Sequence, residues 1–161
     1  MILIKIFFSY MWRFQMLEKI KEDVKNAMKS GDKLKVTTLR MLLSDIHKKE
    51  IDKRGVLTEQ EILGVVSKSI KSRKDSIEEF KRGGREDLVQ KETKEVEILN
   101  VYLPKALSKE EIIKGIEDII KETGAAGGRD FGRVMKEMMT RYQGQVDGKE
   151  TSELIKQKLG G

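Results

Sequence analysis

The stretch MMTRYQGQVDGKETSELIKQKL, residues 138–159, contains an Asp-Gly pair flanked by apolar residues. Such a pair is a strong signal for a two-residue β-hairpin, but Asp147 is equally a good N-cap for a helix. A hairpin needs apolar residues at alternate positions, whereas those on both sides of this pair are three and four residues apart. We therefore expect two helices joined at Asp147, with Gly144 at positive φ after the first of them.

The same helical spacing of apolar residues continues through the rest of the chain, and no stretch alternates as a strand would. Capping boxes are expected at Thr58 with Glu61 and at Ser108 with Glu111, and Asp130 is the expected N-cap of the helix before the Asp147 joint. The expected helices cover roughly residues 17–30, 33–54, 58–82, 88–103, 108–123, 130–142 and 147–159.

Pro104 is the only proline and disfavours helix in the residue before it. The sequence thus predicts an all-α fold in two parts: an amino-terminal helical bundle over residues 16–103, with about four helices, and a C-terminal three-helix domain over residues 104–161.

Composition excludes several classes of site. The 161 residues include one histidine and no cysteine, which argues against His- or Cys-based metal sites and against a Ser-His-Asp triad. We expect no cofactor and no catalytic residue, because no set of side chains supplies a nucleophile, a base and an oxyanion site. Absence of disulfides fits a reducing compartment, so a cytoplasmic location is expected.

The net charge of +6 is mild and spread along the chain. Residues 16–104 hold 20 basic and 17 acidic residues, and residues 105–161 hold 11 and 10. This balance permits binding to a polyanion without requiring it.

The first fifteen residues, MILIKIFFSYMWRFQ, differ from the rest in carrying the only tryptophan and three of the five phenylalanines. They are shorter than the roughly 20 apolar residues of a membrane span, and they lack the pattern of a signal peptide. We interpret residues 1–15 as an extraneous or over-extended start before Met16. A short membrane-surface anchor is the alternative.

Three stretches carry a family resemblance when taken together: TLRMLLSDIHKKEI (38–51), SRKDSIEEFKRGGREDLVQKETKEVEILNVYLPKALSKEEI (72–112) and GRVMKEMMTRYQGQVDGKETSELIKQKL (132–159). The chain from Met16 onward resembles the YqeY family. The second part of that family is similar to the tail domain of GatB, a component of the tRNA-dependent amidotransferase, and is known as the GatB/YqeY domain. Residues on the family's pattern include Arg73, Lys74, Asp75, Phe80, Gly84, Arg85, Asp87, Leu88 and the run from Tyr102 to Pro104.

That resemblance implies a non-catalytic helical module that binds tRNA or associates with an amidotransferase. One alternative is a protein-interaction adaptor, with a partner helix held in a groove between the two parts. Another is a carbon-nitrogen ligase activity with glutamine as the amido donor, which is the activity of the enzyme that contains GatB.

Two basic regions are the candidate sites if the protein binds tRNA. Exposed positions of the last two helices supply the first region, which consists of Arg133, Lys136, Arg141, Lys149 and Lys156. The second surrounds the Gly83-Gly84 break, where backbone amides could also face an anion, and it consists of Lys71, Arg73, Lys74, Arg82 and Arg85.

Overall fold

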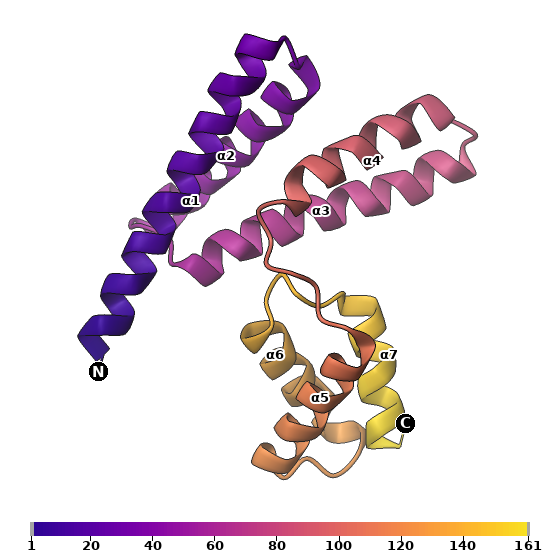
Figure 1. Ribbon diagram of the computed structural model, residues 1–161. Helices are drawn as coiled ribbons and strands as arrows, with labels where there is room; N and C mark the ends of the chain where they lie inside the picture. Colours follow the sequence, from indigo (N-terminus) through magenta and orange to yellow (C-terminus); the bar gives the residue numbers. More distant parts are fainter. Residues whose placement is uncertain (1, 161) are drawn as a thin grey trace. The chain divides into compact units, whose positions relative to one another are not determined.

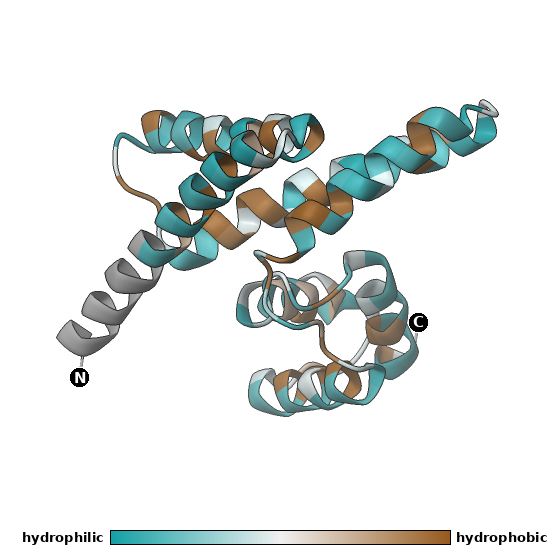
Figure 2. Cartoon of the chain, turned by 45° about the horizontal axis from the view of Figure 1, so that its top comes forward, coloured by the Kyte–Doolittle hydropathy of each residue, from teal (hydrophilic) through white to brown (hydrophobic). Residues whose placement is uncertain are grey.

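The computed structural model describes the backbone of residues 2–160 and the side chains of residues 15–160, and these residues fold into α-helices with no strand among them. The predicted all-α fold is confirmed. Figure 2 shows hydrophobic and hydrophilic residues interleaved along the helices, as amphipathic packing requires. The elements are α1 (Ile2–Ser30), α2 (Lys33–Lys53), α3 (Glu59–Arg82), α4 (Glu86–Asn100), α5 (Lys109–Thr123), a 3-10 turn η1 (Gly128–Asp130), α6 (Phe131–Arg141) and α7 (Gly148–Leu159).

The chain divides into two compact units, Met1–Leu103 and Pro104–Gly161. Unit 1 consists of two helical hairpins, α1 with α2 and α3 with α4, which pack on each other (Figure 1). The far ends of α3 and α4 continue past the shared core as a two-helix projection, in which Val89 is buried. The buried core of unit 1 is formed by Met16, Ile20, Val24, Leu39, Leu42, Ile46, Leu57, Ile62, Leu63, Val65, Val66, Ile70, Leu99 and Tyr102.

Two polar contacts, one buried and one partly buried, join distant parts of unit 1. At the base of the projection, Arg73 Nε donates to Glu95 Oε2 at 2.8 Å, and Arg73 Nη1 donates to the Ser69 hydroxyl at 2.6 Å. At the end of α4, the Tyr102 hydroxyl donates to Asp23 Oδ2 at 2.5 Å. Burial, and then the neighbouring Asp23 carboxylate, raise the pKa of Tyr102 well above its usual range. Both contacts fix α4 against the helices beside it.

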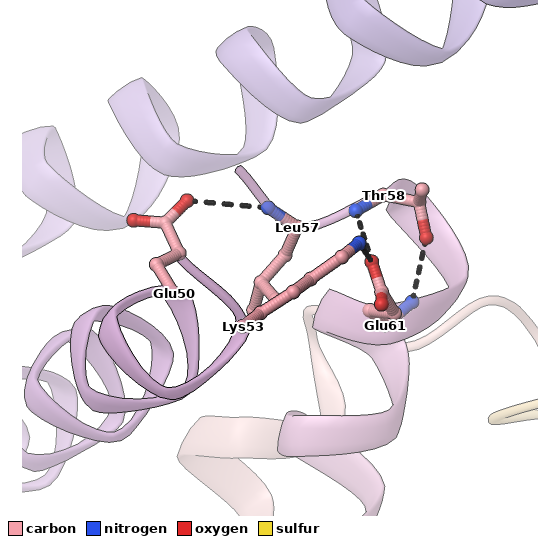
Figure 3. A network of polar contacts seen from close by, with 5 residues as sticks. All are labelled: Glu50, Lys53, Leu57, Thr58 and Glu61. Carbon is pink, nitrogen blue, oxygen red and sulfur yellow. Dashed lines mark hydrogen bonds and ion pairs between the residues drawn. The ribbon is translucent and has the colours of Figure 1, made fainter. Parts of the chain in front are cut away.

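The joint between α2 and α3 is held by side chains that bond to backbone amides (Figure 3). Thr58 and Glu61 form the predicted capping box, and Glu61 also pairs with Lys53 at 2.6 Å. The Glu50 carboxylate accepts from the Leu57 amide at 3.4 Å. Contact with Lys53, followed by the Thr58 amide, lowers the pKa of Glu61 to about 2.

Unit 2 consists of α5, α6 and α7 around a separate core. The Ser108–Glu111 capping box begins α5, and Gly124 ends it at φ 64°. Gly115 leaves room for the Tyr142 ring, because a Cβ at position 115 would lie 2.9 Å from Tyr142 Cε2. The core consists of Ile112, Ile116, Ile119, Ala125, Val134, Met138, Leu154, Ile155 and Leu159.

The joint at Asp147 is helical, as predicted. Its Oδ1 accepts from the backbone amides of Lys149 at 2.9 Å and Glu150 at 3.3 Å, which caps the first turn of α7. Gly144 has φ 79°, the left-handed conformation expected for a glycine after a helix. The hairpin alternative is excluded because the residues on both sides are helical.

Three local predictions differ from the structure. Asp130 gives no side-chain cap to α6, because the helix is entered through η1 and the carboxylate accepts instead from the Ala126 amide at 2.9 Å. Helix α4 ends at Asn100 rather than near Leu103. Helix α1 begins at Ile2 rather than near Leu17. The interpretation of residues 1–15 as extraneous stays a prediction, because the side chains of residues 1–14 lie outside the described part of the chain.

Candidate nucleic-acid interface

The first candidate surface lies on α6 and α7 of unit 2. Val134 and Met138 of α6 and Leu154 and Ile155 of α7 face the core. Because helical residues between such positions point away from the core, the five predicted basic side chains of these two helices are all exposed.

Three of the five cations take part in no ion pair among the described residues. They are Lys136 on α6 and Lys149 and Lys156 on α7. Lys149 and Lys156 are two turns apart on the same side of α7, about 10 Å along its axis. The Lys156 ammonium also lies 5.9 Å from the centre of the Phe131 ring, which places it beside the first residue of α6. These three positive charges remain available to an anion.

The two arginines of this surface are already paired. Arg133 contacts Asp130 at 2.8 Å. Arg141 contacts Glu122 of α5 at 2.7 Å and Glu137 at 3.3 Å. The Glu122 contact, supported by Glu137, raises the pKa of Arg141 above its usual value. A phosphate would have to compete with these carboxylates for both arginines.

The second candidate surface, around the end of the α3–α4 projection, differs most from what the sequence predicted. Arg73 is only 8% exposed and is bonded to Glu95, so its guanidinium faces the interior rather than a ligand. Arg85 is exposed but bidentate to Asp87, at 3.0 and 2.8 Å, and contact with Asp87 raises its pKa. Lys71, Lys74 and Arg82 are exposed.

The glycine break between α3 and α4 does not offer its amides to an anion. The Gly83 amide donates to the Glu79 carbonyl, Gly84 to Lys81 and Arg85 to Phe80, at 3.0, 3.2 and 2.9 Å. The expectation of free amides is wrong because the end of α3 uses them to satisfy its own last carbonyls. This surface therefore keeps four exposed cations, of which Arg85 is paired with Asp87, but loses the backbone component and Arg73.

One basic residue near the first surface was not predicted. Arg129 lies in η1, two residues before Phe131, and is exposed without an ion pair in the described part of the chain. Arg129 lies in the GAAGGRD turn (124–130), so the spacing of residues along a helix could not indicate it. Together with Lys156 it places a second unpaired cation near the start of α6.

The described residues contain neither a metal-binding group nor a helix that could span a membrane. No group of three or more His, Asp or Glu side chains is arranged there to hold a metal ion. No helix in that part of the chain has both the length and the apolar character needed to cross a membrane.

Comparison with curated proteins gives relatives that share one name, "Altered inheritance of mitochondria protein 41, mitochondrial". The relative from Lachancea thermotolerans is 49% identical over 85 residues, which is 52% of this chain and 46% of the relative. The one from Kluyveromyces lactis is 44% identical over 107 residues, 64% and 57% of the two chains. The one from Pyrenophora tritici-repentis is 31% identical over 149 residues, 89% and 81% of the two chains. In the first two, the match spans about half of the relative's length.

These names place the relatives in mitochondria, which contradicts the cytoplasmic location expected from the sequence. That expectation rested on the absence of cysteine, which excludes disulfides but does not separate one reducing compartment from another.

The family comparison covers almost the whole chain. The family model described as "Yqey-like protein" matches residues 17–159, which include the last fourteen residues of α1 and all of α2 to α7. The match and the all-helical structure agree with the resemblance found in the sequence, and this chain belongs to the YqeY family.

Proposed function

We propose that this protein is a helical tRNA-binding module, associated with amidation of aminoacyl-tRNA, and that unit 2 holds the RNA. The observation that carries the proposal is a set of three exposed lysines on α6 and α7 that form no ion pair within the described residues: Lys136, Lys149 and Lys156. The resemblance of residues 104–161 to the amidotransferase tail supports tRNA as the polyanion.

The form of recognition follows from the side chains available. Unit 2 has two aromatic residues, Phe131 and Tyr142, and both are partly covered by its own core. Few aromatic rings are therefore exposed for stacking on bases, and contacts from lysines to phosphates supply most of the binding free energy. Binding of this kind depends on salt and reads the shape of the RNA more than its sequence.

The experiment compares two variants that lose the same charge. One replaces Lys136, Lys149 and Lys156 with alanine, and the other replaces Lys71, Lys74 and Arg82 of the second candidate surface and spares Arg85, which is paired with Asp87. Affinity for bulk tRNA is measured by fluorescence anisotropy over a series of salt concentrations. The logarithm of the binding constant is plotted against the logarithm of the salt concentration. Removal of each lysine–phosphate interaction should reduce the magnitude of the slope of this plot by about 0.7 to 0.9.

We expect the α6–α7 variant to lose affinity and salt slope and the projection variant to keep both. Arg133 and Arg141 are left in place because each is paired with carboxylates. Their removal would leave the negative charges of Asp130, Glu122 and Glu137 without these partners. Unchanged affinity and slope in the α6–α7 variant would refute the assignment to unit 2. Loss in the projection variant alone would move the site to α3 and α4.

A further inference from the structure

Exposed apolar side chains gather along one side of α2 in unit 1. Of the five large hydrophobic residues exposed in the described part of the chain, Met41 (51%) and Ile51 (62%) lie on α2, and Val56 (45%) lies just after it. A fourth, Met28 (55%), contacts α2 through its sulfur, 3.4 Å from Arg40 Nη2. Burial of the core does not explain these positions, since Leu39, Leu42 and Ile46 of the same helix already face it.

These residues belong to a stripe with helical spacing, here named the α2 outer face. Its positions follow one another at intervals that keep them on one side of a helix. The stripe contains no carboxylate, and its cationic side chains form no ion pair within the described residues. The α2 outer face consists of Arg40, Met41, Ser44, His47, Lys48 and Ile51.

The joint that follows α2 contains Val56 between residues that are held by side-chain contacts. Val56 is next to Leu57, which is 1% exposed and whose amide bonds to the Glu50 carboxylate (Figure 3). The Lys53–Glu61 pair closes the other side of the joint at 2.6 Å. An exposed valine between such contacts stays available to a partner.

Arg54 adds a cation at the end of α2, next to Gly55. Arg54 has φ 54°, and no other described non-glycine residue has a positive φ. Gly55 does not have one, and a Cβ at that position would meet no atom within 4 Å. Arg54 is the C-cap of α2, a position where glycine more often takes the left-handed conformation. The result is an exposed cation next to a bare stretch of backbone at the end of the α2 outer face.

We propose that the α2 outer face binds an acidic amphipathic helix of a partner protein. From Arg40 to Ile51 the face is about 16 Å long, room for three turns of a helix lying along it. Met41, Ile51 and Val56 would bury the apolar side of that helix. Arg40, Lys48 and Arg54 would lie against its carboxylates.

A lipid surface fits this face less well. Asp45 and Asp52 run along one border of it, one turn from Met41 and Lys48. A flat anionic membrane would be pressed against these carboxylates, and the face has no aromatic residue for the interface. A helix is narrow and can leave both aspartates in water.

The test measures binding of a fluorescein-labelled synthetic helix to the full chain. The peptide has leucine at every third and fourth position and glutamate elsewhere. Anisotropy should show saturable binding that weakens as salt is added. A matched peptide with lysine in place of glutamate should not bind. Amide shifts in a nuclear magnetic resonance titration should change between residues 40 and 56. Absence of saturable binding, equal binding of the lysine peptide, or shifts elsewhere would overturn the proposal.

Variants identify the surface. Met41→Glu with Ile51→Glu should weaken binding of the acidic peptide at least tenfold, while Val101→Glu, at an equally exposed apolar residue, should leave it unchanged. Thermal melting checks that each variant keeps its fold. Equal affinity of the double variant and the wild type would refute the proposal.

Two other occupants give distinct results. If the wild type is a dimer by light scattering and the double variant is a monomer, the face binds a second copy of the chain. If the wild type sediments with phosphatidylglycerol vesicles and the double variant does not, the face binds lipid. Either result would overturn the assignment to a partner helix.

Discussion

Replacement of Arg73 by methionine should destabilise unit 1 strongly. The Arg73 and Glu95 side chains are 10% and 9% exposed, and their 2.8 Å contact lies between α3 and α4 at the base of the projection. Methionine fills much of the arginine volume but leaves the Glu95 carboxylate buried without its partner. Breaking a buried ion pair in this way costs about 3 to 5 kcal/mol, a large part of a domain's stability of roughly 5 to 15 kcal/mol.

The double variant separates the pair's net contribution from the cost of an orphaned charge. Arg73→Met with Glu95→Leu removes both charges, and such replacements are often neutral or stabilising. The double variant should therefore recover most of the loss seen in the single one. Lys71→Met, an exposed control two residues away, should change stability by less than about 0.5 kcal/mol.

Urea unfolding followed by circular dichroism gives these free energies, and amide hydrogen exchange locates the loss. Exchange should rise along α3 and α4 and stay unchanged in unit 2. The reasoning fails if Arg73→Met costs less than about 1 kcal/mol, because the pair would then behave as a solvated one. It also fails if the double variant is as unstable as the single variant.

Three further outcomes can be measured by unfolding. Gly132→Ala should stabilise α6 by up to about 1 kcal/mol, because the added methyl meets open space. Gly115→Ala should not stabilise α5, because the Tyr142 ring would have to move. Equal gains in stability from the two substitutions would contradict the ring contact. Asp147→Ala should cost about 1 kcal/mol through loss of the α7 cap, with exchange rising in unit 2 alone; a rise in both units would show that they unfold together. The pKa of Glu61 is lowered to about 2 from 4.5, so its stabilisation is present above pH 4.5 and is lost as the pH falls toward 2; a Glu61→Gln variant whose melting temperature follows the wild type across that range would exclude this linkage.

The parts of the fold that depend on neighbouring residues could be predicted from the sequence. The capping boxes at Thr58 and Ser108 and the cap at Asp147 each join residues no more than three positions apart, so a local pattern contains the whole contact. Asp130 was predicted as a cap by the same rule. It bonds backward to Ala126 because a 3-10 turn precedes α6, and residue type alone did not indicate that turn.

The state of the candidate site depended on contacts between distant residues. Arg73 looked like its exposed neighbour Lys74 in the sequence, but its partner Glu95 lies 22 residues away on another helix. Likewise, the contact of Arg141 with Glu122 crosses from α6 to α5. Spacing within a helix predicts which side chains leave the core, and it does not show which carboxylate of another helix neutralises them.

The contact between Tyr102 and Asp23 has a consequence for how the protein is made. The two residues are 79 positions apart, and the core of unit 1 includes both Ile20 from α1 and Leu99 from α4. At synthesis rates of about 5 to 20 residues per second, α1 waits roughly 4 to 16 s for the end of α4 to leave the ribosome. During that interval α1, α2 and α3 can pack on one another, but their shared core still lacks Leu99 and Tyr102. A nascent chain stalled before Tyr102 should therefore engage chaperones, and one that has released Leu103 should not.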